Sequence, residues 1–373
     1  MSWLNEHKTQ IRSAVIGVIV LGAAGLAASG TYLYRQRVAT EAEIAQREYE
    51  SELAAAEAER QAALESQKAE EAAQKAEMLE IFRFDTEDNT VQWNGKTYKR
   101  NSYTKAILVA GIDRSNEMTE AKELGEAGQS DGLFLIAQDT ARNELKILSI
   151  PRDTITEITI TDNQGNVLGK ELDHLSLAFS YGDGMHKSGE YMTEAVSEFL
   201  KGFEIDGYLA ADMAIIKELN DAVGGVTVTV PQFGMEDADA AFVPGQQVTL
   251  TGDLAERFVR YRDTNLDHSA IYRMNQQKEY ITQYFNALKK KSTENSQIVT
   301  ELFELMEGYM VTDMAKDEYM KIALDALTSS GISPESFYLI PGNSMTTEMY
   351  DEFHANMQET IPLILGLFYR EIS

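Results

Sequence analysis

Cysteine is absent from the 373-residue sequence, so neither a disulfide framework nor a thiolate metal site is possible. The five histidines are scattered without a short-spaced pair, which argues against a histidine-based metal site. Basic residues are few, because 33 Lys and Arg face 60 Asp and Glu and leave a formal charge of −27. This balance argues against nucleic acid as a partner of the bulk surface, although a local basic pocket still suits a small anion. The length allows one large domain or two small ones with a real core.

A charge-free apolar stretch lies near the N-terminus, over residues 13–34. As a helix it would span about 33 Å, which is enough for a bilayer core. We therefore predict a cytoplasmic tail over residues 1–12 and a single uncleaved transmembrane helix over 13–34. The alternative is a cleaved signal peptide, because Ala27-Ala28-Ser29 offers small residues to a peptidase. The apolar run continues past that point, which favours the anchor, whereas basic residues on both flanks leave the orientation open.

A low-complexity segment follows. Residues 41–80 contain 12 Ala and 12 Glu but neither Gly nor Pro, a composition of high helix propensity. We interpret residues 35–84 as a solvated helical stalk, with weak self-association through a coiled coil as a possibility and disorder as the alternative. Asn94-Gly95 between alternating β-forming residues then predicts a hairpin extension over 85–104.

Residues 105–373 carry apolar runs of strand and helix length. Runs at 106–111, 133–137 and 145–150 predict three strands, of which the last two form an antiparallel hairpin. Other strands are expected at 207–210, 226–230, 248–250 and 336–340. Helical spacing predicts helices over 172–181, 189–201, 213–223, 251–260, 271–290, 296–312 and 315–329, and a last one from about Tyr350. Such interleaving is typical of an α/β fold with a mixed sheet and helices on both faces.

Two charged clusters stand out in this region. Pro151 cannot donate to a sheet ladder and should end the strand before it, which places Arg152 and Asp153 in the first turn beyond a strand end. The second cluster is Arg260-Tyr261-Arg262-Asp263, at the end of a predicted helix. Two adjacent guanidinium groups suit a phosphate or diphosphate. Taken alone, each cluster favours a structural interpretation, through an Arg–Asp pair or through arginines at a helix C-terminus.

Two further aspartates, Asp113 and Asp131, lie at the ends of predicted strands. Their carboxylates are hard oxygen ligands and would be able to share a divalent cation. The alternative for each is a cap or turn residue.

Seven short segments occur together in the order typical of one family, although each is weak alone. They are Leu108–Asp113, Ser130-Asp131, Ser149–Thr154, Ala178–Gly182, Ala222–Val226, Val259–Arg262 and the helix start with Arg273 and Gln277. In these segments the chain resembles the LytR-CpsA-Psr family of cell-wall proteins. The resemblance runs from about Lys105 to about Phe285, roughly half of the chain.

The resemblance implies a bacterial, membrane-anchored and outward-facing domain with an α/β/α sandwich fold. It further implies a transferase that uses Mg²⁺ to move a glycopolymer, such as wall teichoic acid or capsular polysaccharide, from a polyprenyl diphosphate carrier to peptidoglycan. The implied acceptor is the muramic acid 6-hydroxyl.

The resemblance also implies residue roles. Asp113 and Asp131 would hold Mg²⁺ on the diphosphate, and Asp153 would orient Arg152. The implied catalytic residues are Asp131, Arg152, Asp153 and Arg262, with Asp131 or Asp153 as alternatives for the general base. The implied diphosphate-binding residues are Arg152, Arg260, Arg262, Arg273 and Gln277.

Four positions depart from the family pattern. Gln129 replaces an Arg, Gly132 replaces a Thr, and His174-Leu175-Ser176 stands for Lys-Ile-Asn. At the helix start the family pattern has two Arg, and in the preferred alignment Arg273 matches the first and Gln276 replaces the second. The other alignment matches Arg273 to the second Arg and Ala270 to the first. These departures motivate an alternative hypothesis, a non-catalytic membrane-anchored module that binds polyprenyl phosphate or wall polymer as a scaffold or regulator. A third hypothesis is a hydrolase that admits water as the acceptor.

Overall fold

The computed structural model describes residues 47, 51, 53–70, 73, 82–85, 89–114, 117–235, 237–263, 269–347 and 350–372. The chain divides into two compact units, residues 1–80 and 81–373. In the first unit, residues 53–70 are helical. The predicted tail and transmembrane helix over residues 1–34, and much of the predicted stalk, lie outside the described residues. Within the described part of the chain, no helix is both long enough and apolar enough to span a bilayer.

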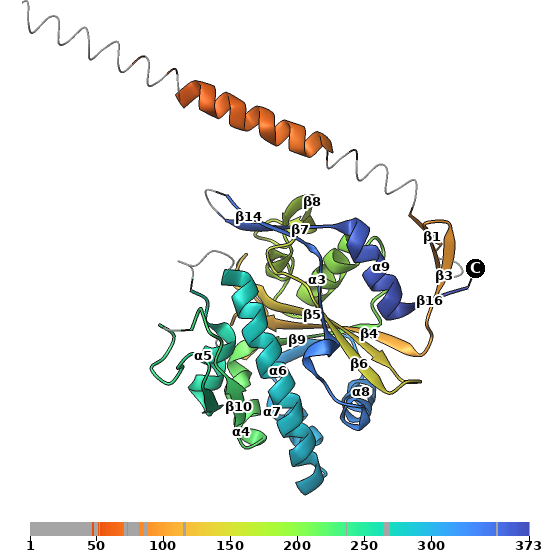
Figure 1. Ribbon diagram of the computed structural model, residues 1–373, viewed down its shortest axis with the longest axis vertical. Coiled ribbons are helices and arrows are strands. Elements are labelled where there is room, and N and C mark those ends of the chain that lie inside the picture. Colours follow the sequence, from red (N-terminus) through yellow and green to blue (C-terminus); the bar gives the residue numbers. More distant parts are fainter. Residues whose placement is uncertain are drawn as a thin grey trace, which may run out of the picture. The chain divides into compact units, whose positions relative to one another are not determined.

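A six-stranded mixed sheet forms the centre of the second unit (Figure 1). The strands lie in the order β12 (Met310–Thr312), β9 (Gly207–Asp212), β4 (Thr104–Ile112), β5 (Ser130–Asp139), β6 (Glu144–Ser149) and β13 (Phe337–Leu339). β9 and β4 are parallel, as are β6 and β13, whereas the other neighbours are antiparallel. The predicted α/β class with a mixed sheet is confirmed, as is the antiparallel β5–β6 hairpin.

Side-chain contacts show which helices cover each face of this sheet. Leu108 of β4 pairs with Tyr208 of β9, and a Cβ added at Gly189 of α3 (His186–Phe199) would lie 2.3 Å from the Tyr208 ring. α3 therefore packs directly on that face. On the opposite face, Gln138 of β5 donates to the Ile322 carbonyl of α8 (Lys316–Thr328) at 3.0 Å. Apolar runs buried on both sides explain why β4 and β5 are central strands.

A second packing region surrounds the two-stranded sheet of β10 (Val226–Thr229) and β11 (Gln247–Leu250). Asp212 caps the turn that leads into α4 (Ile216–Ala222), because its side chain accepts from the Ala214 amide at 2.8 Å. α5 (Asp253–Arg260), α6 (Ser269–Glu294) and α7 (Ile298–Met306) follow in the chain.

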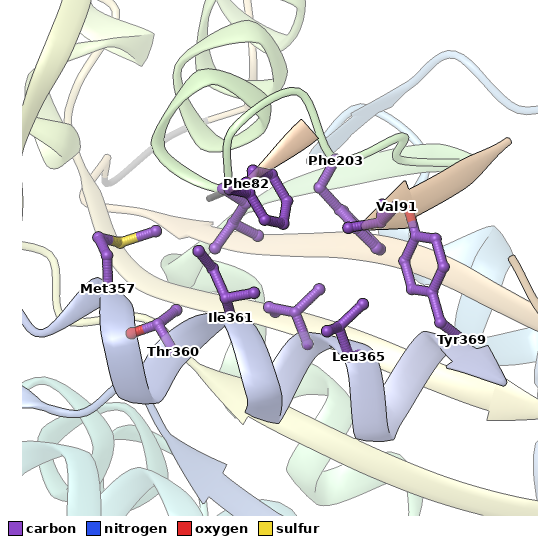
Figure 2. Close-up of a pocket in the computed structure, with 10 residues that line it drawn as sticks. Phe82, Val91, Phe203, Met357, Thr360, Ile361, Leu365 and Tyr369 are labelled. Carbon is purple, nitrogen blue, oxygen red and sulfur yellow. The ribbon is translucent and has the colours of Figure 1, made fainter. Parts of the chain in front are cut away.

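The predicted N-terminal hairpin is confirmed, and a strand near the C-terminus pairs with it. β1 (Arg83–Asp85), β2 (Thr90–Trp93), β3 (Lys96–Arg100) and β16 (Tyr369–Glu371) form one antiparallel sheet. Side chains of this sheet and of α9 (Met357–Phe368) enclose an apolar cavity of about 20 Å³ (Figure 2). The cavity is therefore a packing defect rather than a ligand site.

The predicted helix over 172–181 is wrong. β7 (Ile155–Thr161) and β8 (Val167–His174) form a hairpin, and two short 3-10 turns follow at Leu175–Leu177 and Phe179–Tyr181. The hairpin had no alternating signal, because β8 leaves apolar side chains such as Leu172 exposed. β7 buries Ile158 completely, and β8 contacts α3 through a 2.9 Å ion pair between Lys170 and Glu194.

Two helix boundaries near the C-terminus also differ from the prediction. Residues 351–355 form β15, which pairs with β14 (Gly342–Thr346), so the last helix does not begin at Tyr350. Asn356 caps α9 instead, accepting from the Gln358 amide at 3.1 Å. The helix expected over 296–312 ends at Met306, and Gly308 at φ 86° lets the chain turn into strand β12.

Candidate anion-binding site

Asp131 occupies an irregularity in the central sheet. Gly111 of β4 pairs with Gly132, but the next residue, Ile112, pairs with Ser130. Asp131 is the extra residue between them, so the pairing has the form of a β-bulge. Bulges commonly re-aim a side chain beside an active site, and here the Asp131 carboxylate reaches arginines from two other elements. The sequence predicted Asp131 at a strand end but not this bulge.

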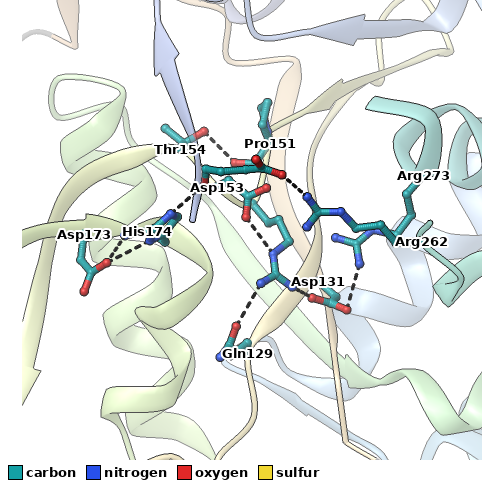
Figure 3. A network of polar contacts seen from close by, with 11 residues as sticks. Gln129, Asp131, Pro151, Asp153, Thr154, Asp173, His174, Arg262 and Arg273 are labelled. Atoms are coloured by element: carbon teal, nitrogen blue, oxygen red, sulfur yellow. Dashed lines mark hydrogen bonds and ion pairs between the residues drawn. The ribbon is translucent and has the colours of Figure 1, made fainter. Parts of the chain in front are cut away.

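Gln129, Asp131 and Asp153 lie close together (Figure 3), and Arg152 contacts all three. It lies in the turn that follows β6, as Pro151 predicted. Its guanidinium donates to the Asp131 carboxylate, to Asp153 Oδ1 at 3.1 Å and to Gln129 Oε1 at 3.2 Å. All three partners come from motif positions or from a position next to one. The implied pairing of Asp153 with Arg152 therefore has a direct contact.

Arg273 approaches Asp131 from the first turns of α6. It donates to Asp131 Oδ2 at 3.2 Å and is only 5% exposed. Burial and the neighbouring charges of Arg152 and Arg262 lower the pKa of Arg273 to about 10. A buried cation beside two like charges is unfavourable unless an anion balances them. Carboxylates of Asp131, Asp153 and Asp113 supply negative charge here, and a multiply charged anion would compete with them for the guanidinium groups.

Arg262 completes the group of three arginines. It lies two residues beyond α5 and donates to the Asp351 carboxylate at the start of β15. The sequence reasoning missed Asp351, because its partner is 89 positions away and no local pattern marks it. Arg260 has a different environment, since it forms a 2.8 Å ion pair with Glu256 of its own helix. Among the described contacts, Arg260 is not joined to this network.

Asp113 and Gln277 lie at the margin of the network. Asp113 follows β4, accepts from the Gln129 amide at 2.6 Å and contributes to the electrostatic environment of Arg273. Gln277 is buried beside Gly132, where an added Cβ would lie 3.6 Å from its Nε2 atom. The tighter contact at this glycine is with the Phe134 ring, 3.2 Å from the position of an added Cβ.

The β14–β15 hairpin is fastened to this network at several points. The Phe353 amide donates to the Asp153 carbonyl at 2.8 Å. His174 Nε2 lies 2.9 Å from the Asp351 carbonyl and Nδ1 lies 3.0 Å from the Asp173 carboxylate. Both partners are acceptors, so both contacts are hydrogen bonds only when the His174 ring is protonated. A segment beyond the motif region thus forms one wall of the site.

The departures from the family pattern fall in different surroundings. Gln129 is within the network through Arg152, and His174 holds the hairpin. Gln276 instead turns toward the second packing region, where its Nε2 lies 2.6 Å from Met235 Sδ. The side chain at position 276 therefore does not enter the arginine group in this structure.

Comparison with known proteins places this geometry in a family. Residues 55–360, most of the chain, match the LytR_cpsA_psr family. The chain is 34% identical over 158 residues to polyisoprenyl-teichoic acid–peptidoglycan teichoic acid transferase TagU of Bacillus cereus, covering 42% of this chain and 44% of that protein. It is 32% identical over 157 residues to the protein of the same name from Halalkalibacterium halodurans, with the same coverages. The chain thus spans less than half the length of these curated relatives.

Solved structures support the fold. The structure of B. subtilis TagV has a TM-score of 0.53 and 21% identity, covering 71% of this chain and 97% of that one. TagT bound to LI-WTA has a TM-score of 0.53 and 18% identity, covering 71% and 90%. At these sequence identities the structural matches support the fold alone. The family match over residues 55–360 shows that the chain belongs to the LytR_cpsA_psr family.

Proposed function

We propose that the chain is a transferase that moves a glycopolymer from a polyprenyl diphosphate carrier to peptidoglycan. Family membership and the transferase names of the TagU relatives support this proposal. The observation that carries it is the convergence of Arg152, Arg262 and Arg273, of which Arg273 is buried. Fixed guanidinium groups at one point suit the adjacent phosphates of a diphosphate.

The acidic partners of these arginines fit a site for an exchangeable anion. Asp131 and Asp351 accept from the same guanidinium groups that would bind the diphosphate. Without ligand they offset part of the charge of the three cations, and in the complex phosphate oxygens would take over part of this role. Preorganised donors of this kind stabilise charge that develops on phosphoryl oxygens in a transition state.

Asp113 and Asp131 are the carboxylates that we propose for Mg²⁺. No group of three or more acidic or histidine side chains suited to a metal occurs in the described part of the chain. Mg²⁺ is nevertheless commonly held by one or two carboxylates together with substrate phosphates and water. Two carboxylates beside the arginines fit that donor set. When bound, the cation would neutralise charge on the diphosphate oxygens.

The proposed reaction exchanges one phosphorus–oxygen bond for another. The acceptor hydroxyl oxygen bonds to the phosphorus that carries the glycopolymer, and the bond from this phosphorus to the bridging oxygen breaks. That oxygen leaves with the electron pair as polyprenyl phosphate. The hydroxyl proton passes to a carboxylate, for which we propose Asp153. Its Oδ2 is buried and accepts no hydrogen bond from the described residues, whereas Asp131 is held by two arginines.

The N-terminal region of the chain would place this site at the outer face of the cell membrane. We propose that residues 13–34 anchor the chain in the cell membrane and that residues 35–84 space an outward-facing α/β/α domain from it. The composition of these segments supports the proposal. Weak self-association through the stalk is compatible with its helical composition.

The test compares two neighbouring arginines in the full chain. The chain is incubated with a polyprenyl diphosphate-linked glycan, soluble peptidoglycan fragments and Mg²⁺, and phosphate-linked product and released polyprenyl phosphate are measured by mass spectrometry. Arg262→Ala is expected to lower kcat/KM by about 100-fold, the scale for losing one charge-stabilising donor. Arg260→Ala should change it by less than about threefold, because Arg260 pairs with Glu256 outside the network.

Different outcomes separate the hypotheses. Product that disappears with EDTA supports the Mg²⁺-dependent transferase. Tight lipid binding without product, across several donors, would instead support a non-catalytic scaffold. Product formed only with water as the acceptor would indicate a hydrolase. Equal losses in the two arginine variants would contradict the assigned diphosphate site.

A further inference from the structure

A cavity of about 280 Å³ opens beside the arginine group. Its walls come from three separate parts of the chain. The turn after β6 contributes Pro151 and Asp153, the first turns of α6 contribute Ile271 and Met274, and the remainder comes from β13 and the β14–β15 hairpin. We call this cavity the hairpin pocket. Its size is sufficient for a small ligand, unlike the apolar cavity under α9.

The hairpin pocket has walls of opposite character to the arginine group. Asp153 and Asp351 supply carboxylates, and Ser344 and Thr346 supply hydroxyls. Carboxylates accept hydrogen bonds and repel anions. The anionic diphosphate therefore belongs at the arginines, whereas the pocket favours an uncharged ligand with several hydroxyl donors.

Asp153 gives an independent sign of a ligand. It lines the pocket, is only 7% exposed, and its Oδ2 atom has no hydrogen-bond partner among the described residues. Leaving a buried carboxylate oxygen without a donor is unfavourable. A small rotation of the carboxylate would let a hydroxyl in the pocket supply the missing hydrogen bond.

The remaining walls suit the carbon face of a sugar ring. Ile271 and Met274 provide apolar surface from α6, and Phe353 provides an aromatic side chain from β15. Pockets that combine apolar surface with a few placed polar groups are typical of small-molecule sites. A sugar presents both surfaces, because its hydroxyls lie at the ring edge and its C–H groups on the ring faces.

The pocket also has the position that an acceptor requires. Asp153 accepts from Arg152, and Asp351 accepts from Arg262, so both carboxylates touch the arginine group and line the pocket. Because Asp153 contacts Arg152, a ligand hydroxyl at Asp153 would lie next to a diphosphate held by Arg152. Such proximity of reacting groups is a main source of rate enhancement.

We propose that the hairpin pocket binds an uncharged, hydroxyl-bearing sugar ring of the acceptor glycan strand, and that the β14–β15 hairpin determines acceptor recognition. This inference rests on the proposed transferase function and assigns its second substrate. Donor and acceptor then occupy adjoining sites of opposite charge character, with Asp153 at their boundary.

The test fills the pocket with a larger side chain introduced on the exposed hairpin. Ser344 and Thr346 both line the pocket, so the alternation of β14 places Asn343 on the opposite face. Ser344→Trp should fill the pocket, and Asn343→Trp is the matched control at another exposed position of the same strand. Both variants are made in the full chain. Thermal unfolding verifies that each retains the fold.

Three measurements separate the two substrates. The first is binding of geranylgeranyl diphosphate, which should be unchanged in both variants. The second is binding of tetra-N-acetylchitotetraose, an uncharged oligosaccharide, by calorimetry. The third is KM for peptidoglycan fragments in the transfer assay. Ser344→Trp is expected to weaken oligosaccharide binding and to raise this KM at least about tenfold, whereas Asn343→Trp should match the wild-type chain.

Each outcome decides the inference. Unchanged oligosaccharide binding and an unchanged KM in Ser344→Trp would overturn it, while transfer by the wild-type chain would leave the proposed function standing. Equal effects of the two tryptophans would also overturn it. A wild-type chain that binds neither geranylgeranyl diphosphate nor the oligosaccharide and makes no product would overturn both proposals together.

Discussion

Asp131 stands between two guanidinium groups, and this position explains much of the local electrostatics. Its two oxygens accept from Arg152 and Arg273, so one carboxylate offsets part of two positive charges. Asp153 and Asp351 offset Arg152 and Arg262 in the same way. Arg273 is the most buried of the three arginines, and burial is the main cause of its lowered pKa, followed by the charges of Arg152 and Arg262. A charged ligand therefore gains most where Arg273 is involved.

Binding of a diphosphate should depend on the protonation of Arg273. The anion binds the charged guanidinium, so affinity for geranylgeranyl diphosphate should be full below the lowered pKa and fall as pH rises through about 10. Above that value the expected loss is about tenfold per pH unit, since one proton must be regained on binding. An ordinary arginine would show no such loss in this range. Calorimetric titration from neutral pH to pH 11, with circular dichroism at each pH, measures the effect.

The control for this dependence is Arg273→Gln. The variant should bind more weakly at neutral pH and should lack the Arg273 contribution to the alkaline decline. Lysines and tyrosines that titrate nearby remain in both proteins and therefore cancel in the comparison. The same alkaline decline in both proteins would show that another group is responsible.

At this scale the sequence predicted the arginines better than their partners. Pro151 marks the strand end, so Arg152 and Asp153 were placed correctly by local chemistry. Asp351 carries no local signal, because its role depends on a hairpin that folds back over the motif region. Gln276 shows the same limit, since only the helix packing reveals that it faces Met235.

Among the secondary-structure elements, α3 packs against the part of the sheet that presents Asp131. Gly189 lets this helix approach Tyr208, and Ser130 beside the Asp131 bulge contacts Met192 of the same helix at 3.5 Å. Close packing at one end of the sheet thus supports the strand that presents Asp131. A displaced α3 would disturb both the core and the bulge.

Gly189→Ala should destabilise the second unit. The added Cβ would lie 2.3 Å from the ring of Tyr208, which is only 2% exposed and has no space to move away. Overpacking of this kind costs about 1–3 kcal/mol of unfolding free energy. Urea unfolding followed by circular dichroism measures the change, and diphosphate binding reports whether the bulge is disturbed as well.

Gly366→Ala is the matched control in α9. Gly366 is exposed, and an added Cβ would meet no atom within 4 Å. Because alanine has the higher helix propensity, this variant should gain about 0.5–1 kcal/mol. Similar destabilisation by the two substitutions would contradict the close approach of α3 to the sheet.

Periodicity predicted the buried elements and failed at exposed hairpins. The apolar runs of β4, β5 and β6 were sufficient, because burial on both faces leaves a continuous signal. Strands β8 and β14 of the two missed hairpins are exposed along most of their length, so burial imposes little pattern on them. Their positions are set by contacts far along the chain, such as Lys170 with Glu194.

Across the whole molecule, the two ends of the second unit meet in one sheet. β16 near the C-terminus pairs with β3, and Arg100 of β3 lies over the rings of Phe203, Phe368 and Tyr369. Arg100 also forms a 3.0 Å ion pair with Asp206, just before β9. The N-terminal hairpin is therefore an integral part of this unit rather than a linker.

A fragment of residues 81–373 should fold without residues 1–80, because it forms a compact unit by itself. Its unfolding free energy and its affinity for geranylgeranyl diphosphate should match those of the full chain. A shorter fragment of residues 101–373 should be less stable by about 3–6 kcal/mol. It loses the buried side chains of Val91 and Trp93, each worth about 1.5–3 kcal/mol, together with the strand that pairs with β16. Urea unfolding of the three proteins measures both differences.

The pair of fragments separates two kinds of dependence on the N-terminal region. If 81–373 were markedly less stable than the full chain, residues 1–80 would stabilise the domain directly and would be more than a spacer. If 101–373 were as stable as 81–373, the pairing of β3 with β16 would contribute little. The expected order, with only the shorter fragment impaired, follows from where the hydrogen bonds and buried rings lie. It would place the boundary between the two units before β1, close to residue 81.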